Sequence, residues 1–130
     1  MTRYSRFALL LSLLAGAMIL SVGCGDDDNG TNSSNHVPAI LSITADPDTF
    51  VVYNYTTITV TAEDEDNDPL SYTWDQRASW MLPLASSANI LELSNCCEVS
   101  QLTGGYVVVT VSDGQGGQAV DSIQIWVRPA

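Results

Sequence analysis

The chain has 130 residues, with 15 acidic and 4 basic side chains and a formal net charge of −11. This length allows one compact domain with targeting and linker segments, and it excludes most large enzyme folds. The basic residues are all arginine and lysine is absent, so the chain offers no surface for neutralising phosphates. These numbers argue against nucleic-acid binding.

Residues 1–23 have the pattern of a signal peptide. Arg3 and Arg6 precede an uncharged run over 7–20 that is rich in Leu, Ala and Met. The run is shorter than the roughly 20 apolar residues that a transmembrane helix needs. Cationic residues ahead of such a run leave the rest of the chain on the far side of the cytoplasmic membrane. We therefore expect a leader that is removed from the mature protein.

The end of this leader, Ser21-Val22-Gly23-Cys24, resembles the lipobox of bacterial lipoproteins. The resemblance implies that Cys24 becomes the first residue and carries a diacylglycerol and a further acyl chain, which together give stable membrane anchoring. Gly25, which stands in place of an Asp, favours the outer membrane of the cell envelope over the inner membrane. The alternative is an ordinary secreted protein that is cut nearby, with Cys24 as a stray thiol.

Residues 24–36 are expected to form a flexible acidic linker. The stretch GDDDNGTNSSNH after Cys24 has no aliphatic or aromatic side chain to bury. His36 is the only histidine and lies in this linker, which removes His-based catalysis and most His-ligated metal sites. Without Arg3 and Arg6, the mature chain has 15 acids against 2 arginines, a balance of −13.

From residue 37 onward, apolar side chains recur with a period of two, which is typical of half-buried strands. The expected strands cover residues 39–44, 57–62, 70–75, 80–84, 89–93, 107–111 and 123–127. Asp46-Pro47-Asp48 ends the first by turn chemistry, and Ser-Asp-Gly-Gln-Gly-Gly over 112–117 predicts a hairpin between the last two. The alternation that predicts strands is weakest between residues 77 and 102.

About seven strands and no helical period predict an all-β domain over residues 37–130. This size and rhythm are those of an immunoglobulin-like antiparallel β-sandwich. Trp74 on the third strand is expected at the centre of the core. No pair of cysteines is spaced to bridge the two sheets, which disfavours the antibody type of this fold.

Two segments of the domain resemble a known family. Residues 62–74, AEDEDNDPLSYTW, and residues 105–117, GYVVVTVSDGQGG, are similar to the PKD-type and cadherin-like immunoglobulin-fold modules of bacterial surface proteins. The chain departs from the PKD pattern after Trp74-Asp75, where a Gly-Asp-Gly turn is absent. The resemblance implies an adhesion, spacer or recognition module that is not itself a catalyst.

Five acids in six residues, 63–68, are the most unusual feature of the domain. In an immunoglobulin-like sandwich the turn after the second strand lies at the same end as the turn between the last two strands. Carboxylate oxygens from Asp64, Asp66, Asp68 and Asp113 are therefore expected to form a calcium site. The competing interpretation is that Asp and Asn are ordinary turn residues. The segment is not an EF-hand, because Pro69 stands where glycine is required.

Two further features are candidate sites. Cys96 and Cys97 are adjacent, and in an oxidising envelope they form either a vicinal disulfide or an intermolecular one, or remain as thiols. Trp126 is out of phase with the apolar residues around it. It is a candidate for stacking on sugars, or it packs under a loop.

No catalytic apparatus is recognisable in the sequence. There is no Gly-x-Ser-x-Gly motif, and the glycines of 114–117 precede a strand and not a helix. A hydrolase needs only two carboxylates, but nothing selects two from fifteen. We therefore predict a lipid-anchored envelope protein that is not an enzyme and that binds an unidentified envelope protein or glycan. The alternative is a carbohydrate-binding lipoprotein or an accessory module of an envelope enzyme complex.

Overall fold

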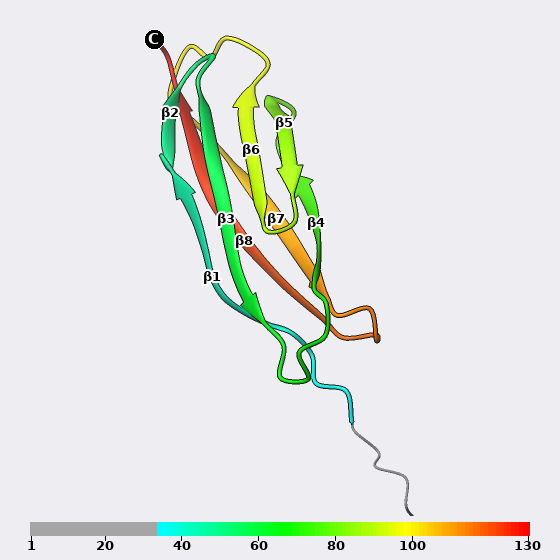
Figure 1. Ribbon diagram of the computed structural model, residues 1–130. Coiled ribbons are helices and arrows are strands. Elements are labelled where there is room, and N and C mark those ends of the chain that lie inside the picture. Colours follow the sequence, from blue (N-terminus) through cyan, green and yellow to red (C-terminus); the bar gives the residue numbers. More distant parts are fainter. Residues whose placement is uncertain (1–33) are drawn as a thin grey trace, which may run out of the picture. The chain divides into compact units, whose positions relative to one another are not determined.

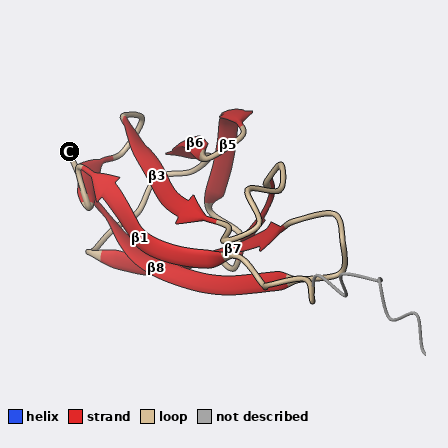
Figure 2. Ribbon diagram, turned by 60° about the horizontal axis from the view of Figure 1, so that its bottom comes forward, coloured by secondary structure: helices blue, strands red, loops and turns tan. Residues whose placement is uncertain are grey.

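The computed structural model describes residues 34–130, and Figure 2 shows only strands and loops over this range. The predicted signal peptide, Cys24 and the linker up to residue 33 lie outside the described residues. Among residues 34–130 there is no helix with the length and apolar character needed to cross a membrane.

Eight strands form two four-stranded sheets (Figure 1). In chain order they are β1 (Ala39–Asp46), β2 (Thr49–Val51), β3 (Tyr55–Glu63), β4 (Ser71–Gln76), β5 (Met81–Ser87), β6 (Ile90–Asn95), β7 (Thr103–Ser112) and β8 (Gln118–Arg128). One sheet has the order β1-β3-β6-β5 and the other β2-β8-β7-β4. All neighbours are antiparallel except β2 and β8. This order matches the two sheets of an immunoglobulin-like sandwich, so the predicted fold class is confirmed.

The eighth strand is β2, which follows the predicted turn at 46–48 and was not expected from the sequence. β1 ends at Asp46 in one sheet, and β2 begins at Thr49 in the other. Pro47 has no N–H to donate to a ladder. The N–H of Trp126 donates to the carbonyl oxygen of Asp48 at 2.9 Å, which fastens the chain to β8 after it leaves β1. Turn residues therefore transfer the chain from one sheet to the other.

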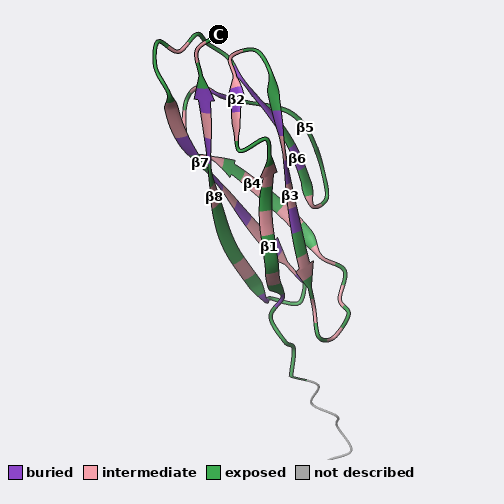
Figure 3. Cartoon of the chain, turned by 90° about the vertical axis from the view of Figure 1, so that its left-hand side faces the viewer, coloured by how far each residue is buried: buried purple, intermediate pink, exposed green. Residues whose placement is uncertain are grey.

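The core lies between the two sheets and follows the predicted alternation. Val107, Val109 and Val111 of β7 are all 0 % exposed, as are Ile58 and Val60 of β3. Figure 3 shows the buried residues as short purple segments along the strands. Full burial of each such side chain contributes about 1.5–3 kcal/mol to the free energy of unfolding. The remaining buried hydrophobic residues are Phe50, Met81, Leu91, Leu93, Ile125 and Val127.

Trp74 does not occupy the centre of the core as predicted. It is only partly buried, and its indole N–H donates to the carbonyl oxygen of Ala88 at 3.4 Å. Trp74 lies on β4, which is one of the two edge strands of its sheet. One side of the ring therefore has no neighbouring strand to cover it, and Ile58, Leu91 and Ile125 fill the centre instead.

The weak patterns between residues 77 and 102 correspond to the paired strands β5 and β6. β5 is an edge strand of its sheet, and only Met81 among its residues is buried. Its register shifts between Pro83 and Ala85. An edge strand with one buried residue lacks the regular alternation that identifies a strand from sequence, which explains the weak signal.

The strands run between two ends of the domain, which we name by their contents. The acidic end holds the loops 64–70 and 113–117 together with the entering segment 34–38, and the disulfide end holds the loops 52–54, 77–80 and 96–102. Register supports this division, because Ala39 pairs with Glu63 and Ser71 with Ser112. At the opposite end Val51 pairs with Arg128 and Thr103 with Val127. Figure 1 shows the acidic end at the bottom and the disulfide end at the top.

Candidate acidic site

The loop between β3 and β4 is folded around one carboxylate. Oδ1 of Asp64 accepts the N–H of Asp66 at 3.0 Å and that of Asp68 at 3.2 Å, and the carbonyl oxygen of Asp64 accepts the N–H of Asn67 at 3.1 Å. Asn67 has φ 61°, in the left-handed region that asparagine tolerates better than most residues. Local hydrogen bonding by Asp and Asn therefore shapes this loop.

Three of the four predicted calcium ligands come together in the loop. One carboxylate oxygen each from Asp64, Asp66 and Asp68 lies within 4.8 Å of the other two. The Oδ2 atom of Asp64 is buried, and it accepts no hydrogen bond within residues 34–130. Burial and the charges of Asp64, Asp66 and Asp113 raise the pKa of Asp68. This arrangement has the oxygen donors that a hard cation takes.

Asp113, the fourth predicted ligand, organises the neighbouring loop. It is 3 % exposed, and its Oδ1 accepts the N–H of Gln115 at 2.7 Å and that of Gly117 at 2.9 Å. Its Oδ2 accepts the side-chain Nδ2–H of Asn35 at 2.8 Å. The Asn35 amide, followed by the backbone N–H groups, holds the pKa of Asp113 below its usual range despite burial. Its carboxylate is thus already engaged by protein donors.

The two loops meet across a hollow. Its lining residues are Asn35, Asp66, Asp68 and Gln115. The structure therefore brings the two predicted acidic turns to one end of the sandwich. It groups Asp64, Asp66 and Asp68 directly, while Asp113 acts on this group through its charge.

Sequence reasoning missed Asn35 and His36, which it assigned to the linker. The backbone N–H of His36 donates to Oδ2 of Asp66 at 2.7 Å, and Nδ1 lies 3.1 Å from both carboxylate oxygens. Nε2 lies 3.8 Å from Glu65. The Asp66 hydrogen bond is the main cause of a raised pKa of His36, and the His36 backbone hydrogen bond is the main cause of a lowered pKa of Asp66. The only sequence signal was a single imidazole beside a strongly acidic domain.

The other two candidate features lie away from the acidic end. Cys96 and Cys97 form a disulfide with each other at the opposite end. Trp126 is partly buried on the outer face of β8 and pairs with Gly104 of β7. A Cβ atom placed on Gly104 would lie 2.7 Å from the Trp126 ring. The ring therefore packs on the backbone of β7, which accounts for its outward phase.

Comparison with models of known protein families and with curated proteins gives no match. A functional hypothesis for this chain therefore depends on the chemistry and the geometry of its own residues.

Proposed function

We propose that the protein is a lipid-anchored interaction module of the bacterial cell envelope. This proposal rests on the difference between the two ends of the domain. The chain enters at the acidic end through residues 34–38, whereas Tyr53, Tyr55 and Leu102 are 65 %, 59 % and 54 % exposed at the disulfide end. A tether on one end presents the other end to a partner.

The exposed side chains suit a protein partner. Tyrosine offers a large amphipathic surface at a low cost in side-chain entropy and is enriched at interfaces. Tyr55 pairs with Ser94, which pairs with Leu82, so Tyr55 and the exposed Leu82 lie in one row across the sheet. The domain is strongly acidic, which favours a partner with an apolar centre and a basic rim. The resemblance to PKD-type and cadherin-like modules is consistent with such a role.

Calcium binding is part of the proposal. A calcium ion held by Asp64, Asp66 and Asp68, with Asp113 adding its charge from the next loop, would relieve their mutual repulsion. The unpartnered Oδ2 of Asp64 supports this choice of ligands. Such an ion would stiffen the end at which the tether joins the domain, as a cation does wherever it replaces carboxylate repulsion with coordination.

The lipid anchor is proposed from Cys24 and has its own test. Cells are grown with an alkyne fatty acid, and the protein is then tested for label and for partition into a detergent phase. Native chain is expected to carry the label and to partition into detergent, and Cys24→Ser is expected to lose both. Label that persists in Cys24→Ser would overturn the anchor.

The interaction is tested by measuring binding of the purified protein to intact envelope fraction and to itself. The double variant Tyr53→Ser with Tyr55→Ser is expected to lose at least about tenfold in affinity, as loss of buried aromatic anchors does. Val120→Ser is the control, because Val120 is 63 % exposed on the other sheet and lies outside both candidate surfaces. Equal loss in both variants, or in neither, would contradict a binding role for the disulfide end.

A carbohydrate ligand is the second candidate, and one observation favours it. Trp126 pairs with Gly104 and Gln124 with Tyr106, so two aromatic rings and an amide share the outer face of one sheet. Flat aromatic surface with adjacent amide groups suits stacking on sugars. Binding on a glycan array that Trp126→Ala abolishes, while Tyr53→Ser leaves it intact, would favour this candidate over the first.

A further inference from the structure

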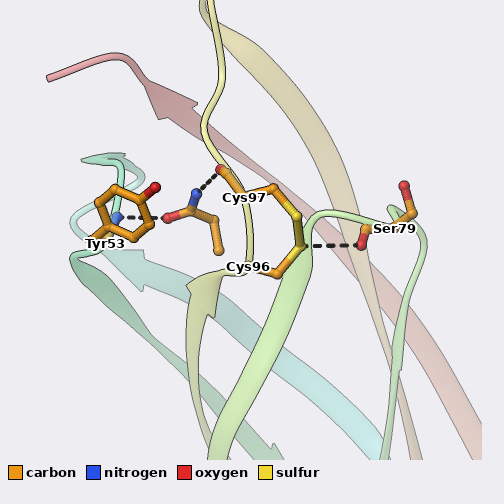
Figure 4. The surroundings of a disulfide bond; sticks show 5 residues. Tyr53, Ser79, Cys96 and Cys97 are labelled. Carbon is orange, nitrogen blue, oxygen red and sulfur yellow. Dashed lines mark hydrogen bonds between the residues drawn. A yellow bond between two sulfur atoms is a disulfide. The ribbon is translucent and has the colours of Figure 1, made fainter.

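The disulfide end carries a bond between two adjacent residues. Cys96 and Cys97 follow β6, and their sulfurs lie 2.22 Å apart. Both residues are exposed, so a reagent in solution can reach them. Figure 4 shows the disulfide beside Tyr53 and Ser79, which come from two other loops.

This disulfide does not act as a staple for the whole fold. The stabilisation that a disulfide gives through the unfolded chain grows with the length of the loop it closes. Here the sequence separation is 1, so almost no chain is closed. The bond restricts only the peptide between the two cysteines, and its effect must be local. Exposed disulfides are also the ones that exchange most readily with thiols.

On one side the disulfide is joined to the loop between β4 and β5. The N–H of Cys96 donates to the carbonyl oxygen of Trp80 at 2.9 Å, and Sγ of Cys96 lies 3.7 Å from the carbonyl oxygen of Ser79. The Trp80 ring lies 6.4 Å from the ring of Phe50, which is buried in the core. The loop that binds Cys96 is therefore itself anchored to the core through Trp80.

On the other side the disulfide is joined to the turn between β2 and β3 through one buried side chain. Asn95 is 3 % exposed. Its Nδ2–H donates to the carbonyl oxygen of Cys97, and its Oδ1 accepts the N–H of Tyr53 at 2.7 Å. The orientation of the Cys97 carbonyl thus bears on the position of the Tyr53 turn.

We propose that Cys96–Cys97 is a site of thiol–disulfide exchange with a dithiol partner, and that its redox state sets the conformation of the loops at this end. The proposal does not depend on calcium, on the lipid anchor or on the partner suggested above. It assigns the adjacent cysteines a role in control and not in stability.

The exchange balances with a dithiol reductant alone. A thiolate of the reductant attacks Sγ of Cys97, which breaks the Cys96–Cys97 bond, forms a mixed disulfide and releases the Cys96 thiolate. That thiolate takes a proton, and the resulting thiol has the Ser79 carbonyl oxygen as an acceptor at hand. The second thiolate of the reductant then attacks the reductant sulfur of the mixed disulfide. This breaks the bond to Sγ of Cys97 and releases the Cys97 thiolate, which takes a proton. The reductant leaves as a disulfide, and two electrons and two protons have passed to the cysteines.

The Cys97 carbonyl lies outside the disulfide ring, but the φ torsion of Cys97, which helps to orient it, is a torsion of that ring. Opening the ring frees this torsion. The Cys97 carbonyl is then no longer held towards Nδ2 of Asn95. Because a buried amide without an acceptor is unfavourable, the Asn95 side chain shifts to stay paired. Asn95 consequently holds the Tyr53 N–H less firmly. The reduced form is expected to have a looser turn at Tyr53 with an unchanged sandwich.

The test uses the full chain with Cys24→Ser, in mild detergent, so that all thiol signal comes from the pair. The protein is treated with dithiothreitol under native conditions and alkylated, and its mass is measured by mass spectrometry. Its amide hydrogen exchange is followed by NMR in a parallel sample. We expect two alkyl groups per chain and exchange at Tyr53 about fivefold or more faster after reduction. The amide of Gln115, held by Asp113 at the acidic end, is the internal control and should not change.

The double variant Cys96→Ser with Cys97→Ser cannot form the disulfide. It should match the reduced protein at Tyr53 and should not respond to dithiothreitol. The proposal is overturned if the disulfide resists dithiothreitol until the domain unfolds, or if the cysteines are linked between chains. It is also overturned if reduction leaves the Tyr53 amide unchanged, or changes Gln115 equally.

Discussion

Asn35 and Asp113 lie 78 positions apart and are joined by a hydrogen bond of 2.8 Å from the amide Nδ2 to the carboxylate Oδ2. The contact fastens the segment that enters the domain to the hairpin loop between its last two strands. The negative charge of Asp113 is therefore stabilised partly by Asn35, a residue outside the acidic loops.

The Asn35 contact predicts a change in the pKa of Asp113. Because the Asn35 amide is the main cause that lowers this pKa, Asn35→Ala is expected to raise it towards its usual range. NMR titration of the Asp113 carboxyl carbon measures the change, with Ser34→Ala as the control at the exposed neighbouring residue. An unchanged or lower pKa in Asn35→Ala would show that the backbone donors alone set it.

Calcium is predicted to stabilise the native domain. An ion that binds only the folded state adds about 2.7 kcal/mol to the free energy of unfolding at 100 times its dissociation constant. For a domain of this size the thermal midpoint should rise by roughly 10 °C or more relative to chelator. Asp66→Asn with Asp68→Asn should abolish the rise.

The matched control for the calcium experiment is Asp46→Asn with Asp48→Asn, which removes the same charge from the exposed end of β1 and the turn that follows it. It should retain the rise. Equal thermal midpoints of the native protein with calcium and with chelator would mean that Asp64, Asp66 and Asp68 are turn residues and not ligands.

The contact between His36 and Asp66 predicts a dependence of stability on pH. The pKa of His36 is raised on folding, so its contribution is complete below about 6.5, the ordinary pKa of histidine, and is lost as pH rises through the folded-state value. The pKa of Asp66 is lowered, so its contribution is present above about 3.9 and is lost as pH falls. The contact is therefore most effective between these two limits.

Thermal midpoints at pH 5.5 and 8.5 test this dependence. Because the contact is exposed to solvent, the native midpoint should fall by only about 1–3 °C more than that of His36→Gln between these values. Parallel pH profiles for the two proteins would rule out a stabilising contact at His36.

The core predicts a sharp contrast between two leucines of the same sheet. Leu93 is 0 % exposed on β6, whereas Leu82 is 44 % exposed on β5. Leu93→Ala should lower the free energy of unfolding by about 2–5 kcal/mol, through lost burial and a residual cavity. Leu82→Ala should change it by less than about 1 kcal/mol. Urea denaturation measures both, and similar losses would contradict the assignment of faces.

The residues that face the core were predictable because strand geometry is local. Side chains at i and i+2 point to the same face whatever the strand pairs with, so Ile58, Val60 and the β7 valines could be placed inward from the sequence alone. Turn chemistry at 46–48 and 112–117 likewise marked the breaks between strands. The prediction that Trp74 lies at the centre of the core was wrong, because burial of its ring depends on whether another strand covers β4.

The all-β class, the buried face of each strand with clear alternation and the grouping of acids in the loop 64–70 all follow from local sequence. The docking of Asn35 on Asp113 and of His36 on Asp66, and the link from the Cys97 carbonyl through Asn95 to Tyr53, depend on the tertiary fold. The physical reason is that these groups are far apart in the chain. Their approach is set by the order and register of strands in two sheets, which no local pattern of residues encodes.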